Sequence, residues 1–228
     1  QNPRFSRDGK FVAWTSMERD GYEADRNRLC VYNLATGEKK YVTESFDSSV
    51  EDFVWSDSKD AMIYFIGVWH ATANLYAVNW KGELKQMMTP VLPQSGSDGQ
   101  KDNAWADFGS IHLMNNGKQL LMERHSFTAP ADLYIVTPNF KKPENTSVQQ
   151  LTFENKHITD QLAKPSVQQR WVKTSDGKEL LAWIILPPNF DETKKYPTLL
   201  FCEGGPQSPV SQFWSYRWNF MIMASQES

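Results

Sequence analysis

Residues 4–16 read RFSRDGKFVAWTS, and the same pattern occurs twice more, as VWSDSKDAMIYFI at 54–66 and HLMNNGKQLLMER at 112–124. In each copy an aromatic or apolar residue precedes a short polar turn, and an apolar run follows the turn. Asp, Asn and Gly suit such turns because they tolerate a positive φ. The turn pairs are Asp8-Gly9, Asp57-Ser58 and Asn116-Gly117. The pattern therefore predicts three hairpins of similar build.

A second matching half follows each hairpin. It reads RLCVYNLATGEKKYVT from residue 28, NLYAVNWKGELKQMMT from residue 74 and DLYIVTPNF from residue 132. Four short strands in about 40–50 residues is the period of a propeller blade. Any meander of hairpins would carry similar turns, but three matching units favour blades. A closed propeller needs at least about four blades, so we expect residues 1–155 to be the terminal blades of a larger propeller.

The pattern changes after residue 155. Residues 156–167 are a polar connector, and QQRWVKTSDGKELLAWIILPPNF at 168–190 predicts a hairpin with its turn at Ser175-Asp176-Gly177. TLLFCE at 198–203 has the continuous apolar character of a strand buried on both faces. SQFWSYRWNFMIMAS at 211–225 predicts an amphipathic helix. We therefore expect a mostly β chain that ends in a second, different domain.

Composition excludes several classes of protein. Of 228 residues, 40% are apolar and 22% charged, and the net charge of −3 comes from acids and bases mixed along the chain. This distribution lacks the basic patch that nucleic-acid binding requires. No apolar run approaches the 18 or so residues of a transmembrane helix. We therefore expect neither a nucleic-acid partner nor a membrane span.

The sequence resembles the prolyl oligopeptidase family of serine peptidases, and most closely its dipeptidyl-aminopeptidase and acylaminoacyl-peptidase branches. The motifs that carry the resemblance are Pro130-Ala-Asp-Leu-Tyr134, Leu151-Thr152, Trp171, Asp176-Gly177, Leu180, Trp183, Pro187, Phe190, Lys195-Tyr196-Pro197 and Gly204-Gly205-Pro206. The family joins a β-propeller to an α/β-hydrolase domain that carries a Ser-Asp-His triad. The resemblance implies blades at 1–155, a connector at 156–167 and the first strands and helix of the hydrolase domain at 168–228.

The triad itself is missing from this sequence. No G-x-S-x-G nucleophile motif occurs. An α/β hydrolase carries its residues in the order Ser, Asp or Glu, then His, whereas every histidine here precedes the hydrolase segment. The histidines are His70, His112, His125 and His157, which we interpret as surface or satisfied blade residues. The chain alone is therefore expected to be inactive, and the catalytic residues to lie in the rest of a longer parent.

The resemblance places one part of the active site in this chain, the oxyanion hole. A backbone N–H of a Gly-Gly-Pro turn can approach a carbonyl oxygen because no Cβ stands in the way. Gly205 is the first candidate and Gly204 the second, while a turn that only links two elements is the alternative. Much of the family has histidine at the position of Glu203, and the dipeptidyl-peptidase-IV-like branch has a tyrosine whose hydroxyl serves the oxyanion. An ionised carboxylate cannot donate, so Glu203 would orient the loop or hold a substrate's free amine.

Three further features have simpler interpretations. Glu51 and Asp52 are adjacent, so in a strand they point to opposite faces, and a solvated blade edge is favoured over a shared amine site. Cys30 and Cys202 both lie in apolar runs and are predicted to be buried, with a disulfide or a reactive thiol as the alternative. No metal-ligand spacing occurs, and we expect no cofactor.

The resemblance implies a serine exopeptidase that releases dipeptides or blocked residues from short peptides, with the propeller as a size filter. Its expected partners are peptide substrates and the remainder of its own polypeptide, or a second copy of the chain. It also implies a periplasmic or secreted location, with a cytoplasmic one as the alternative. The rival interpretation is a non-enzymatic propeller of the TolB or WD40 type that serves as a binding module.

Overall fold

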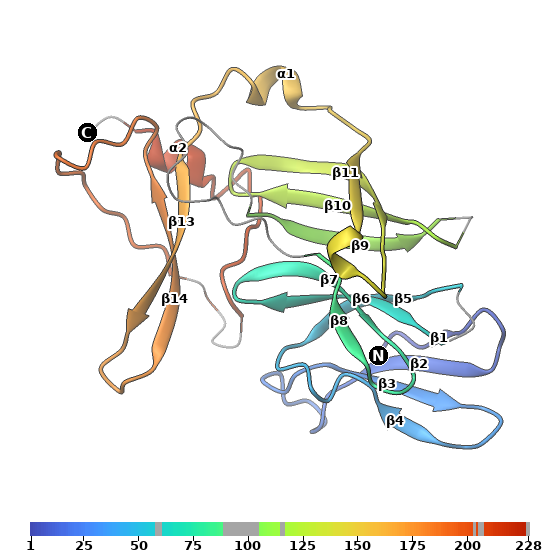
Figure 1. The fold of residues 1–228 in the computed structure, drawn as a ribbon. Coiled ribbons are helices and arrows are strands. Elements are labelled where there is room, and N and C mark those ends of the chain that lie inside the picture. Colours follow the sequence, from blue (N-terminus) through green and yellow to red (C-terminus); the bar gives the residue numbers. More distant parts are fainter. Residues whose placement is uncertain (58–60, 89–104, 115–116, 203, 205–207, 227–228) are drawn as a thin grey trace.

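The computed structural model describes residues 1–57, 61–88, 105–114, 117–202, 204 and 208–226. Within them, residues 4–150 form three four-stranded antiparallel sheets, each with its strands in chain order (Figure 1). The first sheet contains β1 (Arg4–Phe5), β2 (Phe11–Ser16), β3 (Arg28–Asn33) and β4 (Lys39–Tyr41). The second contains β5 (Val50–Trp55), β6 (Ile63–Trp69), β7 (Thr72–Val78) and β8 (Leu84–Gln86). The third contains β9 (Asp107–Leu113), β10 (Leu120–Ser126), β11 (Ala129–Thr137) and β12 (Ser147–Gln150).

The three sheets follow one another through space as propeller blades do. Their first strands contact each other in succession, β1 against β5 and β5 against β9. Antiparallel four-stranded sheets that follow one another are the blades of a propeller. The sequence pattern predicted this arrangement. The prediction of a mostly β fold with propeller blades is therefore confirmed. Gly9 and Gly117 have φ angles of 68° and 65°, as the predicted turns require, whereas Ser58 and Asn116 lie outside the described residues.

The middle sheet is buried on both faces. Along β6, Ile63 and Phe65 face the core shared with the first sheet. Tyr64 and Ile66 alternate with them and face the core shared with the third sheet. Successive side chains of a strand point to opposite faces, so an uninterrupted apolar run is what a doubly covered strand needs.

Three aromatic rings form the centre of the first core. Phe46 contacts Tyr76 at a centroid distance of 4.8 Å and Phe65 at 5.5 Å, and Phe65 stacks on Tyr76 at 5.3 Å. Gly67 makes this arrangement possible, because a Cβ at that position would stand 2.6 Å from the Phe46 ring. Gly67 is therefore needed for the close packing of the aromatic rings and not for a turn.

Polar contacts align the first sheet with the second. The Arg4 guanidinium donates to the Asp52 carboxylate at 2.9 Å and also to the Phe53 carbonyl, while the Trp55 indole donates to the Arg4 carbonyl at 2.9 Å. The strand pairing shifts between Val50 and Asp52, so Glu51 occupies a bulge and is exposed. The adjacent acids therefore form no shared amine site: Asp52 is paired with an arginine, and Glu51 stands apart in the bulge, where partial desolvation raises its pKa.

Beyond the blades the chain forms small elements. The 3-10 helix η1 (Pro143–Asn145) joins β11 to β12, and α1 (Lys156–Thr159) follows the third sheet. The predicted hairpin is present as β13 (Ser166–Lys173) and β14 (Glu179–Leu186), joined by a turn in which Gly177 has a φ of 84°. The short helix α2 (Phe220–Ala224) comes last. Figure 1 shows the hairpin standing beside the blades, with α2 near its base.

Two predicted elements of the C-terminal region are wrong in this structure. Residues 198–202 are not a strand, and Leu199 and Leu200 are 72% and 82% exposed. A strand buried on both faces needs neighbours to pair with, and within the described residues β13 and β14 pair only with each other. An α/β-hydrolase sheet is therefore not seen in the described part of the chain and stays a prediction.

A helix was predicted over 211–225, but only the five residues of α2 are helical. The Ser215 hydroxyl accepts the backbone N–H groups of Arg217 and Trp218 at 3.2 and 2.9 Å. Such local bonds compete with helix formation. The helix begins only where the Asn219 side chain caps it, by accepting the Ile222 N–H at 3.0 Å.

The cysteine prediction is half correct. Cys30 is buried, but Cys202 is exposed because the segment that carries it is not part of a sheet. Burial raises the pKa of the Cys30 thiol. Among the described residues, no helix has the length and apolar character needed to cross a membrane.

Tyr76 provides a test of the first core. Its side chain is 3% exposed, its hydroxyl has no hydrogen-bond partner among the described residues, and burial raises its pKa to about 12. Replacing Tyr76 by Phe removes an unsatisfied polar group, so at pH 7 the free energy of unfolding should stay constant or rise by about 1 kcal/mol.

The same substitution should change the alkaline stability. An unfolded tyrosine ionises near pH 10, so the wild type loses stability as the pH rises from about 10 toward 12, whereas Tyr76→Phe should lose less. Urea unfolding at pH 7 and pH 11 measures both effects. Tyr22→Phe is the control, because Tyr22 is 47% exposed. Equal alkaline losses in Tyr76→Phe and the wild type would contradict the assignment.

Candidate functional site

A hollow of about 730 Å³ borders the predicted oxyanion turn. Gly204 lies on its rim and is exposed, and a Cβ built on it would meet no atom within 4 Å. The backbone at Gly204 is therefore open to an approaching molecule. Apolar side chains form most of the wall, including Leu200, Phe201, Phe213 and Trp218. Gly205 and Glu203, the other predicted site residues, lie outside the described residues.

An aromatic cluster supports the wall of this hollow. Phe220 of α2 packs edge-on against Phe201 at 5.1 Å and against Phe127 at 4.9 Å. Phe127, in the turn between β10 and β11, is 2% exposed and also contacts Phe213 at 5.9 Å. Edge-to-face pairs of this kind are favourable beyond the area that they bury. The hollow is therefore built partly on the third blade.

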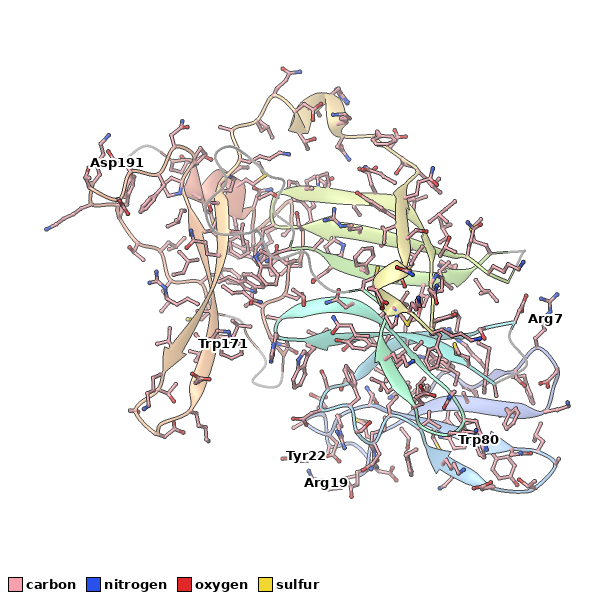
Figure 2. The ribbon with its side chains drawn as sticks, viewed as in Figure 1. Arg7, Arg19, Tyr22, Trp80, Trp171 and Asp191 are labelled. Carbon is pink, nitrogen blue, oxygen red and sulfur yellow. The ribbon has the colours of Figure 1, made fainter. Side chains whose placement is uncertain are left out.

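The β13–β14 hairpin contributes a second support. Trp183 of β14 packs against Trp105 at 5.2 Å and donates its indole N–H to the Val210 carbonyl at 2.9 Å. Gln169 and Trp171 of β13 reach the tip of the second blade: Gln169 donates to the His70 carbonyl at 3.0 Å, and Trp171 meets the His70 ring at 5.1 Å. Figure 2 shows Trp171 between the hairpin and the blades.

One buried acid lies beneath the segment that follows the glycine turn. Asp107, at the start of β9, is 3% exposed and accepts the Ala73 N–H of β7 at 2.8 Å. Burial raises the pKa of Asp107, and the Ser211 hydroxyl, the Ala73 and Gln212 N–H groups and the nearby His125 partly oppose the rise. A buried carboxylate is stabilised only when donors surround it, and here they come from two distant parts of the chain.

Asp107, His125 and Ser211 are not a catalytic triad, although the residue types match. In a triad the serine hydroxyl donates to the imidazole, and the acid holds the other side of that ring. Here the Ser211 hydroxyl acts on the pKa of the Asp107 carboxylate, and among the described residues no hydrogen bond joins it to the His125 imidazole. Sequence reasoning missed Asp107, although an acid within the apolar run AWADF at 104–108 is a signal of a buried, partnered carboxylate.

The remaining histidines and cysteines form no site among the described residues. His112 and His157 are exposed, and His70 stacks on Trp69 at 4.6 Å. Cys202 lines the hollow and is exposed. No group of three or more potential metal ligands occurs in the described parts of the chain.

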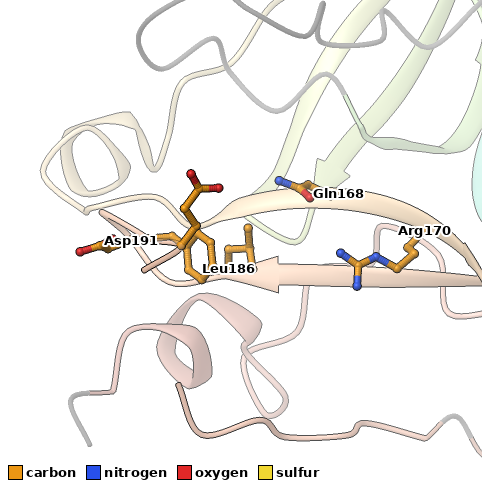
Figure 3. Close-up of a pocket in the computed structure, with 6 residues that line it drawn as sticks. Gln168, Arg170, Leu186 and Asp191 are labelled. Carbon is orange, nitrogen blue, oxygen red and sulfur yellow. The ribbon is translucent and has the colours of Figure 1, made fainter. Parts of the chain in front are cut away.

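A second hollow, of about 620 Å³, lies along the β13–β14 hairpin. Figure 3 shows Gln168, Arg170 and Leu186 along the hairpin, with Asp191 at one end. The Thr193 hydroxyl and N–H donate to Asp191 at 2.7 and 3.0 Å and lower the pKa of this exposed acid. The Asp191 carboxylate therefore accepts hydrogen bonds within its own turn. We assign no chemistry to this hollow.

The chain is similar to known peptidases over nearly its whole length. No family model matches it. It is 45% identical over 226 residues to dipeptidyl-peptidase 5 of Porphyromonas gingivalis and 42% identical over 223 residues to dipeptidyl-peptidase 5 of Porphyromonas endodontalis. These matches cover 98% of this chain but only 30% and 29% of the relatives. The chain therefore spans less than a third of the length of these curated relatives.

Solved structures share the fold. Acylaminoacyl peptidase of Pyrococcus horikoshii matches with a TM-score of 0.68 at 22% identity, over 96% of this chain and 29% of that one. Dipeptidyl peptidase 4 of Porphyromonas gingivalis matches with a TM-score of 0.63 at 17% identity, over 96% and 28%. Together with the curated relatives, these structures confirm the resemblance to the prolyl oligopeptidase family. The rival interpretation as a non-enzymatic propeller is not favoured.

The indole of Trp183 provides a test of how the hollow is supported. Trp183→Phe keeps an aromatic ring but removes the N–H that donates to the Val210 carbonyl. The free energy of unfolding should fall by about 1–2 kcal/mol, and the amides of 208–214 should exchange faster by hydrogen–deuterium exchange. Trp80→Phe is the control, because Trp80 packs against Phe11 in the first core, away from the hollow. Equal exchange at 208–214 in both variants would show that the indole bond does not hold the segment.

Proposed function

We propose that this chain is one segment of a serine exopeptidase that hydrolyses short peptides, of the dipeptidyl-peptidase or acylaminoacyl-peptidase type. The observation that carries the proposal is the open Gly204 backbone on the rim of an apolar hollow that rests on a propeller blade. The names of the relatives support it. In this proposal the blades act as a size filter, so that only short or flexible peptides reach the hollow.

The glycine turn would supply part of the oxyanion hole. A backbone N–H there can meet the developing negative charge on the substrate's carbonyl oxygen, and the N–H of the residue after the nucleophile would be the second donor. Gly205 is the proposed donor and Gly204 the alternative. Glu203 would orient the turn or bind a substrate's free amine. The nucleophile, its base and the orienting acid would come from the rest of the parent polypeptide.

The proposal includes a domain division and a location. Residues 1–155 would be terminal propeller blades, 156–167 the connector and 168–228 the N-terminal portion of the α/β-hydrolase domain. The parent would act on peptides in the periplasm or outside the cell. No cofactor takes part in this chemistry, because a serine nucleophile with its base and an oxyanion hole suffices for acyl transfer.

Removal of single backbone N–H groups tests the site in the full-length parent. Proline has no N–H, so Gly205→Pro should lower kcat by about 10²–10³ if Gly205 is the donor. Gly204→Ala, which keeps its N–H and places its Cβ in open space, should retain most activity. Hydrolysis of a chromogenic dipeptide amide and of an acetyl-amino-acid amide measures both.

A fluorophosphonate probe completes the test. The wild-type parent should be labelled on a serine outside residues 1–228, and a separate preparation of this chain alone should gain no adduct by intact mass. A labelled serine within the chain, or a parent that neither reacts with the probe nor hydrolyses either substrate, would refute the proposed function.

A further inference from the structure

A lysine on the outermost strand of one blade contacts an aromatic ring of the next blade at both junctions between the three sheets. The Lys40 ammonium of β4 lies 4.5 Å from the centroid of the Trp80 ring, which belongs to the second blade (Figure 2). The Lys85 ammonium of β8 lies 4.5 Å from the Phe140 ring of the third blade and donates to the Phe140 carbonyl at 3.1 Å. A cation over an aromatic face is attracted by the charge distribution of the ring. The same contact therefore fastens two successive pairs of blades.

A short sequence motif places each of these lysines. It reads GEKK at 37–40 and GELK at 82–85, and its glycine has a φ of 72° in the first copy and 84° in the second. The glutamate of each motif pairs with the lysine two residues later, at 3.1 Å in the first blade and 3.3 Å in the second. The G-E-x-K motif thus turns the chain into the outer strand and holds an ammonium beside the next blade.

The third blade has a glutamine, Gln149, where the first two have the lysine. A neutral amide cannot make the cation contact, so the motif marks two junctions and is not a property of every outer strand. The strand registers establish that the three positions are equivalent: Lys40 is opposite Val31, Lys85 is opposite Ala77, and Gln149 is opposite Ile135.

The second and third blades each receive the preceding blade with two side chains. One is the ring beneath the lysine, Trp80 or Phe140. The other ends the first strand of the blade. Trp55 at the end of β5 is 7% exposed and packs against Phe11 of the first blade with ring centroids 6.1 Å apart. Leu113 at the end of β9 packs against the core between the second and third sheets.

The first blade has both of these receiving positions, and both are exposed. Phe5 ends β1 as Trp55 ends β5, and it is 68% exposed. Leu34 corresponds to Trp80, because each follows an asparagine whose side chain accepts backbone N–H groups of its own turn. Leu34 is 47% exposed. The first blade therefore presents, uncovered by the described residues, the face that the other two blades bury.

We propose that the face of the first blade that carries Phe5 and Leu34 is the docking surface for one further blade of the parent polypeptide, and that this blade presents the lysine of a G-E-x-K motif to the Leu34 turn. The repeat identifies the occupant, because both described junctions bury the equivalent side chains against a blade. The matched segment covers 30% and 29% of the curated relatives, so a longer parent has chain enough for it. The inference rests on the proposed propeller of the parent and not on its peptidase activity.

The chemistry of this junction would differ from that of the other two. Leu34 has no aromatic face, so the methylene stem of the arriving lysine would pack on it while the ammonium stays in water. Phe5 would enter the apolar core between the two blades, as Trp55 does at the next junction.

Photo-crosslinking in the full-length parent tests the docking surface. With p-benzoylphenylalanine in place of Leu34, irradiation should join position 34 to a peptide of the same polypeptide outside residues 1–228, and peptide mass spectrometry should find a Gly-Glu-x-Lys segment at the crosslink. The same amino acid in place of Trp80 is the positive control, which should crosslink to the segment around Lys40. If the control reacts, the proposal is overturned by a crosslink within 1–228, by a crosslinked dimer or by no crosslink from position 34.

Cysteine labelling decides the matter if the bulky crosslinker prevents folding. Leu34→Cys in the folded parent should react with a maleimide at least about tenfold more slowly than Thr36→Cys, because a buried thiol reacts only when the structure opens locally. Thr36 lies in the same turn and is exposed. Peptide mapping separates the labelled site from Cys30 and Cys202. Equal rates at the two positions would show that no blade covers Leu34.

The role of the lysine can be tested at a described junction. Lys40→Met keeps an unbranched apolar side chain and removes the ammonium, so the amides of 79–83 in the parent should exchange about two- to fivefold faster in hydrogen–deuterium exchange. Gln149→Met is the matched control, because it makes the same kind of change at the equivalent position of the third blade. Equal exchange at 79–83 in both variants would show that the ammonium does not fasten the blades, and the lysine part of the proposal would be wrong.

These readouts are separate from the test of the proposed function. A folded parent without peptidase activity would refute the proposed function, while crosslinking, labelling and exchange would still report how the blades join. An active parent in which Leu34 is accessible and does not crosslink would overturn the docking surface alone.

Discussion

The rest of the structure depends on the burial of the middle sheet on both of its faces. A four-stranded sheet with two apolar faces cannot be stable in water unless each face is covered, because apolar burial is the main favourable term in folding. The first sheet covers the side of Ile63 and Phe65, and the third covers the side of Tyr64 and Ile66. Stacking is therefore obligatory, and the direction of stacking determines where the third blade presents Asp107 and Phe127.

Apolar and polar contacts have different roles at the junction between the blades and the C-terminal region. The aromatic cluster of Phe127, Phe213 and Phe220 brings the two parts together, but rings can slide and repack at little cost. The hydrogen bond from the Trp183 indole to the Val210 carbonyl is directional, so it favours one position for this segment.

Sequence reasoning succeeded where the signal was local. The repeated turn and apolar run identified the blades, and Asp176-Gly177 identified the β13–β14 hairpin. It failed for 198–202 and for most of 211–225. An apolar run forms a buried strand only if neighbouring strands pair with it, and the described residues contain no strand that pairs with this run. The helix was shortened by the Ser215 hydroxyl, which satisfies two N–H groups that a longer helix would have used otherwise.

By itself, the sequence determined the strands and turns of the blades and of the β13–β14 hairpin, because side-chain alternation and positive φ are properties of a few consecutive residues. Only the tertiary structure decided what lies around Gly204. His70 meets Gln169 across 99 residues of chain, because the sheets stack in one order and carry these groups to the same place. No local pattern encodes such a meeting, since it depends on the summed geometry of every strand between the two residues.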